Sequence, residues 1–167
     1  MDAPITRAEF ASLINQAEQA NGDAATAASQ FTDIEASFWG AQGIAGANAV
    51  GFMSGYSTPQ GLVFRPEEQI PRWQVFVTLA SGLELAPPAD VDGFLSGYDL
   101  TGVPNWARAQ VAATINAGLA INADRSKGLE GNRPTTRGEA TAMLQQVLQR
   151  QNKVQEKVDA SPFVIKK

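Results

Sequence analysis

Apolar residues recur at helical spacing in three stretches of the chain. They are Phe10, Leu13, Ile14 and Ala17 in the first stretch, Val75, Leu79 and Leu83 in the second, and Met143, Leu144, Val147 and Leu148 in the third. Intervals of three and four residues place such side chains on one face of an α-helix. The pattern predicts helices near residues 5–20, 70–84 and 136–156.

Each of these predicted helices opens on a similar phrase centred on an arginine. The phrases read ITRAEFASLI, IPRWQVFVTL and TTRGEATAML, and their arginines, Arg7, Arg72 and Arg137, are 65 residues apart. A fixed long period is typical of repeat proteins. The chain therefore consists of related copies of one unit.

Two shorter helices are predicted upstream of the second and third phrases. Ser37–Val50 and Asn105–Ala117 are rich in alanine and glycine, and Trp39 and Trp106 occupy matching positions 67 residues apart. Loops with glycine and proline follow both segments. The first copy has no such upstream segment in this chain, so we interpret it as incomplete.

The arginine phrase has two explanations. In the first and third copies, Thr6 with Glu9 and Thr136 with Glu139 fit the capping box S/T-x-x-E. The cap does not account for the arginine, whose positive charge opposes the helix dipole in the first turn. Arginine beside the free N–H groups of a helix start suits a bound carboxylate or phosphate. The alternative is an internal salt bridge, for example to Asp33 or Asp99, and the pattern leaves both open.

Trp39 and Trp106 also allow two interpretations. They either pack between repeats in the core or form a groove wall for a sugar, because an indole face suits apolar C–H surfaces. An arginine and a tryptophan in one groove would fit an acidic glycan.

Composition narrows the range of functions. The net charge is −4, which argues against nucleic-acid binding. With no histidine and no cysteine, the commonest general base and zinc ligands are missing, so we expect no catalysis, no metal site and no cofactor. No apolar run reaches the roughly 18 residues of a transmembrane helix.

The ordered set of motifs resembles the S-layer homology (SLH) repeat, in a form similar to that of cyanobacteria. The set is an aromatic residue, an aspartate, a tryptophan, an alanine-rich helix, a loop with glycine and proline, and a TRAE-type phrase, and it covers about residues 4–150. The resemblance implies an all-α fold, in which pseudo-threefold helical repeats surround a central three-helix bundle. The expected boundaries are a single domain at 1–160, with repeats at 1–22, 31–84 and 97–150, and a helical extension and tail at 151–167.

The resemblance also implies a function. SLH domains bind pyruvylated, acidic polysaccharide linked to peptidoglycan, which makes Arg7, Arg72, Arg137, Trp39 and Trp106 the candidate ligand-binding residues. We expect a non-catalytic anchoring module of the cell envelope, in the periplasm or cell wall, exported by a signal upstream of this chain. A fused or docked envelope protein is a further expected partner.

The second copy departs from the motif, because Pro71-Arg72-Trp73-Gln74 lacks both the threonine and the glutamate. This departure favours an alternative function, a protein-interaction scaffold of SLH-like repeats that has lost glycan binding.

Overall fold

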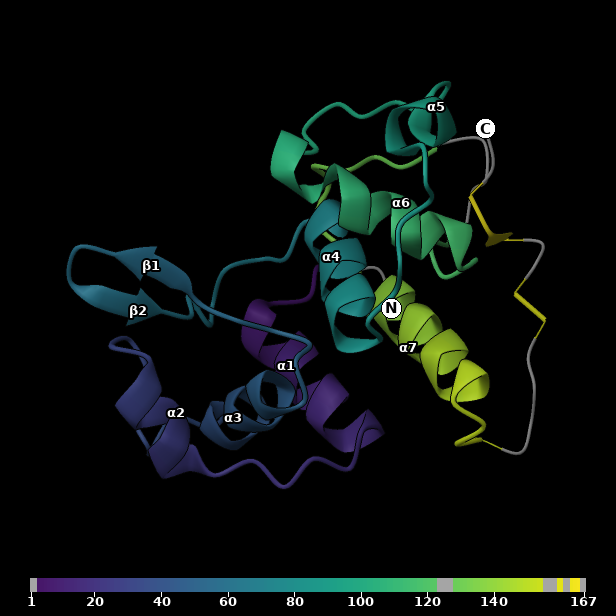
Figure 1. Ribbon diagram of the computed structural model, residues 1–167. Helices are drawn as coiled ribbons and strands as arrows, with labels where there is room; N and C mark the ends of the chain where they lie inside the picture. Colours follow the sequence, from purple (N-terminus) through teal and green to yellow (C-terminus); the bar gives the residue numbers. More distant parts are fainter. Residues whose placement is uncertain (1–2, 123–127, 155–158, 161–162, 166–167) are drawn as a thin grey trace. The chain divides into compact units, whose positions relative to one another are not determined.

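The computed structural model describes residues 3–122, 128–154, 159–160 and 163–165 (Figure 1). The chain divides into two compact units. The first unit is Ile5–Ile70, and the second is Pro71–Lys167 together with Met1–Pro4. Each unit is described separately below.

The first unit contains three helices and a hairpin. They are α1 (Arg7–Ala17), α2 (Ala24–Gln30), α3 (Ala41–Ala49), β1 (Tyr56–Thr58) and β2 (Gly61–Val63). Helix α1 begins with the predicted capping box, in which the hydroxyl of Thr6 accepts from the N–H of Glu9 and the N–H of Thr6 donates to the Glu9 carboxylate. It ends before Gln19, whose φ of 52° the helix cannot continue.

Helix α3 packs closely along α1. A Cβ atom added to Gly43 would lie 2.5 Å from the Ser12 hydroxyl and 2.7 Å from the Ser12 Cα atom. One added to Gly46 would overlap the side chain of Asn15. Glycine at these two positions therefore allows the helix backbones to approach each other.

The second unit repeats much of this arrangement. It contains α4 (Arg72–Gly82), α5 (Val91–Leu95), a 3-10 turn (Asn105–Ala107), α6 (Arg108–Asn116) and α7 (Arg137–Arg150). Helix α4 packs on α6, as α1 packs on α3 (Figure 1). The hydroxyl of Thr114 in α6 donates to the carbonyl of Phe76 in α4 at 2.6 Å, which fixes the two helices side by side.

Backbone geometry recurs in the same places of both units. Gly51 after α3 and Gly118 after α6 have φ of 79° and 72°, and Arg65 and Glu130 have φ of 58° and 45°.

In each compact unit, an arginine-led helix packs on the short helix that follows it in the chain. The predicted repeats, 31–84 and 97–150, paired the short helix with the arginine-led helix after it.

The predicted all-α fold is wrong, because the segment after α3 forms an antiparallel hairpin. Tyr56 pairs with Val63 and Thr58 with Gly61. Tyrosine, threonine and valine favour strands, and Pro59 and Gln60 form the turn before Gly61, whose φ of 121° only glycine adopts easily. The structure is mixed, with seven α-helices and one small sheet among the described residues.

Within the units, the most extensive helix packing pairs α1 with α3 and α4 with α6, whereas the predicted bundle of the three arginine-led helices would join helices of both units. A helical extension beyond residue 150 was also predicted. Helix α7 instead ends at Arg150, and Asn152 has φ of 56°. Residues 155–158, 161–162 and 166–167 of the predicted extension and tail lie outside the described residues.

Candidate functional site

Arg7 is buried and holds the hairpin of the first unit. It is 2% exposed. Its Nε donates to the Phe64 carbonyl at 2.8 Å and its Nη2 donates to the Ser54 carbonyl at 3.0 Å. The guanidinium also lies 4.6 Å from the ring of Tyr56 and 4.7 Å from the ring of Phe64, within cation–π range. Arg7, a candidate ligand-binding residue, therefore does not point into an open groove.

Arg72 has the same role in the second unit. It is 0% exposed. Its Nε donates to the Leu129 carbonyl at 2.9 Å and its Nη2 donates to the Ile121 carbonyl at 2.8 Å. Leu129 is 57 residues after Arg72, the separation that also joins Arg7 to Phe64. In both units, the structure uses the arginine to fix the segment after the short helix and does not present it to a ligand.

Asp33 and Asp99, the aspartates considered as salt-bridge partners for the arginines, bind backbone N–H groups. The carboxylate of Asp33 accepts from the N–H groups of Phe64 and Arg65, both at 2.7 Å. That of Asp99 accepts from the N–H of Thr101 at 2.9 Å, and hydrogen bonds from Thr101 lower its pKa. Asp33 thus helps Arg7 to hold the end of the hairpin.

The carboxylate that meets a buried arginine is that of Glu139, at the start of α7. Its Oε1 lies 2.8 Å from Nη1 of Arg72 and also accepts from Arg133, which in turn pairs with Glu130 at 2.9 Å. Its Oε2 accepts from the N–H of Thr136 at 2.9 Å. The sequence pattern predicted only the capping role of Glu139. It did not predict the contact with Arg72, because the two residues are 67 positions apart in the chain.

The electrostatics of this cluster favour ionised Glu139. Burial raises the pKa of its carboxyl, but the hydrogen bonds from Arg133 and Thr136 and the charges of Arg72 and Arg133 outweigh burial, so the pKa lies below its usual value. The pKa of Arg133 is raised, chiefly by its hydrogen bond to Glu139. The cluster therefore joins α4, the segment before α7 and α7 itself.

We expect Glu139→Gln to destabilise the protein by about 2 kcal/mol at pH 7, because hydrogen bonds to a charged group are lost. The folded-state pKa is below the ordinary value of 4.5, so ionised Glu139 stabilises the fold above that pH. This stabilisation disappears as the pH falls through the folded-state pKa. Urea unfolding at pH 7 and pH 3 should show a difference between wild type and variant that shrinks in acid.

The exposed Glu67→Gln is the control for this measurement, and it should change stability little at either pH. A Glu139→Gln variant that loses the same free energy at pH 3 as at pH 7 would contradict the assigned role of the carboxylate.

Arg137 differs from the other two arginines, because its side chain is exposed. It occupies the first position of α7, and its backbone N–H donates to the carbonyl of Ala3 at 2.9 Å. Of the three candidate arginines, only Arg137 has an exposed side chain that a ligand can reach in the folded protein.

Trp39 and Trp106 are also exposed, by 61% and 64%. Trp39 directly precedes the N-cap of α3, and its ring lies 5.3 Å from that of Phe38. Trp106 lies in the 3-10 turn before α6 and meets Trp73 of α4 edge to face at 5.4 Å. Core packing, one of the two interpretations of these tryptophans, does not describe them. In each unit, a largely exposed indole lies at the start of the short helix.

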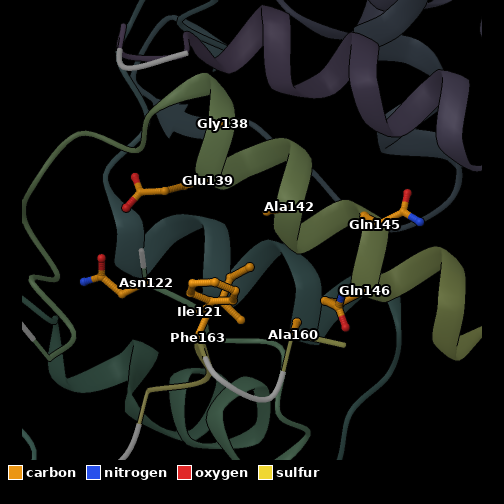
Figure 2. A pocket seen from close by; sticks show the side chains of 9 residues that line it. All are labelled: Ile121, Asn122, Gly138, Glu139, Ala142, Gln145, Gln146, Ala160 and Phe163. Carbon is orange, nitrogen blue, oxygen red and sulfur yellow. The ribbon is translucent and has the colours of Figure 1, made fainter. Parts of the chain in front are cut away.

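A pocket of about 290 Å³ lies beside α7 in the second unit (Figure 2). Gly138, Ala142 and Gln145 line it from the helix, and Ile121 and Phe163 line it from other segments. Its walls are mainly apolar, and nothing in the sequence pattern predicted it.

The chain matches no protein-family model, and no curated protein matches it at a significant level. Among the described residues, no helix has the length and apolar character needed to cross a membrane. The same residues include no cluster of three or more acidic side chains placed to bind a metal ion.

Proposed function

We propose that this protein is a non-catalytic module that binds acidic cell-wall polysaccharide through exposed tryptophans. The observation that carries the proposal is the exposure of Trp39 and Trp106 at matching positions of the two units. An indole that is more than half exposed is not part of the core, and its face suits the apolar face of a sugar ring. The resemblance of the motifs to SLH repeats supports the same class of ligand and a location in the cell envelope.

Two platforms on one chain favour binding to a polymer. A polysaccharide repeats its sugar units, so two weak contacts on one strand increase the overall affinity. Arg137 supplies an exposed cation for the acidic groups of such a glycan, including the carboxylate of a pyruvate ketal. Arg7 and Arg72 are not part of this proposal, because their donors serve backbone carbonyls.

The proposal is tested by sedimentation of the purified protein with cell walls. Trp39→Ala and Trp106→Ala should each weaken retention by about 1 kcal/mol, or roughly fivefold, through loss of ring stacking. The double variant should lose more, with little change in melting temperature. Phe163→Ala removes an aromatic side chain that is 47% exposed elsewhere, and it is the matched control. Retention of the double variant at the wild-type level would refute the proposal.

A separate variant tests the acidic character of the glycan. Arg137→Ala should weaken wall binding by about 1.5–3 kcal/mol, the value of one charge-assisted contact. Walls from which pyruvate has been removed chemically should bind wild type and Arg137→Ala equally. A difference between the two proteins that persists on such walls would place Arg137 on another anionic group.

A protein-interaction scaffold is the second candidate function, and the burial of Arg7 and Arg72 favours it. Two of the three arginines that were expected to bind an anion instead stabilise the fold. If folded wild-type protein fails to bind wall material at all, the scaffold is the better explanation.

A further inference from the structure

One side of α7 matches the side of α1, and the side of α4, on which a short helix packs. It consists of Gly138, Thr141, Ala142 and Gln145, at the register of Ala8, Ala11, Ser12 and Asn15 in α1. In α1, this side carries α3. An added Cβ at Gly40 would lie 3.3 Å from Ala8, and the side chains of Ser12 and Asn15 meet Gly43 and Gly46.

The same side of α4 is covered by α6. Phe76, which corresponds to Ala11 and Thr141, is buried, and its carbonyl accepts the hydrogen bond of Thr114 from α6. Both covering helices are short and rich in small residues, with the sequences AQGIAGANA and RAQVAATIN.

Helix α7 begins in the same way as the two covered helices. An isolated antiparallel bridge joins Thr6 to Gln69 before α1 and Pro71 to Pro134 before α4, and a bridge in the same register joins Thr136 to Pro4 before α7. The N–H of the first residue of each helix donates to a backbone carbonyl at 2.9–3.0 Å. The three helices are therefore equivalent in structure as well as in sequence.

Helix α7 differs from α1 and α4 in lacking such a covering helix within its own unit. Among the described residues of the second unit, no helix packs extensively on it. Thr141 and Ala142 are exposed, whereas Ala11 and Phe76 at the matching place are buried. The pocket of about 290 Å³ begins at Gly138 and Ala142 on this side (Figure 2).

We propose that this face of α7 binds a short glycine- and alanine-rich helix of the α3 type, presented by a different protein and not by a second copy of this chain. The occupant is inferred from the two faces where this register is already filled. A helix with glycine three residues apart can approach the small side chains of α7 as closely as α3 approaches α1. An aromatic residue just before that helix, in the position of Trp39, would fit beside Gly138. Glycine leaves room there, whereas α4 has Trp73.

The experiment uses the whole protein and a synthetic peptide with the sequence of residues 31–65. The peptide is added to isotope-labelled protein while amide chemical shifts are recorded. Shift changes are expected at Gly138, Thr141 and Ala142. Ala142→Arg should weaken binding about tenfold or more, because docking would bury an unpaired charge. Asn116→Arg adds the same charge at an exposed site of α6 and should leave binding unchanged.

A second peptide tests the chemistry of the occupant. Leucine in place of Gly43 and Gly46 should abolish binding, because the helix backbones could no longer approach. The proposal is overturned if the first peptide causes no shifts in α7, if it shifts only α1, or if Ala142→Arg binds it as well as wild type does. A wild-type dimer in sedimentation that Ala142→Arg dissociates would assign the face to a second copy, which also overturns it. None of these results depends on wall binding.

Discussion

Arg72→Ala is expected to destabilise the protein by about 3–5 kcal/mol, as is usual when one partner of a buried charged group is removed. The side chain is 0% exposed and donates to Leu129, Ile121 and Glu139 at 2.8–2.9 Å. Alanine would leave two buried carbonyl oxygens without their donors and a cavity where the arginine side chain was. Because a domain of this size is stable by only about 5–15 kcal/mol, the variant should fold poorly.

Urea unfolding at pH 7 measures this loss, and Arg137→Ala is the matched control. Both changes remove the first arginine of a helix, but Arg137 is exposed, so its loss should change stability by less than about 0.5 kcal/mol. Arg72→Lys should fall between the two, because an ammonium group does not reproduce the planar fork. Equal stabilities of Arg72→Ala and Arg137→Ala would show that the buried hydrogen bonds do not stabilise the unit.

Gly43→Leu is the second change with a large expected effect, about 3 kcal/mol. Its Cβ would lie 2.7 Å from the Cα of Ser12, so relief requires α3 to move away from α1. The melting temperature should fall by several degrees, and the near-ultraviolet signal of the aromatic residues of the first unit should weaken.

Gly51→Ala separates crowding from backbone conformation. Gly51 has φ of 79° and nothing within 4 Å of an added Cβ, so alanine there costs only the left-handed conformation, about 1–2 kcal/mol. If Gly43→Leu is no more destabilising than Gly51→Ala, the close approach of α1 and α3 is not important for stability.

Local sequence signals predicted five of the seven helices that the described residues form, and they missed the short helices α2 and α5. Thr6 with Glu9 and Thr136 with Glu139 form the expected capping boxes, because both halves of each signal lie within four residues. The hairpin was missed, although Pro59 and Gly61 were visible turn residues. Its strands are only three residues long, and their pairing depends on Asp33 and Arg7, far away in the chain.

The candidate site was predicted less well than the helices. The repeated arginines do mark equivalent positions of the fold. A sequence pattern, however, cannot distinguish a guanidinium that binds a ligand from one that donates to a backbone carbonyl 57 residues away. The tryptophans were identified at matching positions, and only the structure revealed that both are exposed. No sequence pattern predicted the apolar pocket, because its walls come from three separate segments of the chain.

The 57-residue reach of each buried arginine also sets an order of events during synthesis. Arg7 leaves the ribosome well before Phe64, and at a typical 5–20 residues per second the interval is about 3–11 s. Throughout that interval its charge remains hydrated, so α1 cannot settle into its final surroundings. The first unit is complete before Leu129 is made, so the nascent chain acquires its two buried cations one after the other.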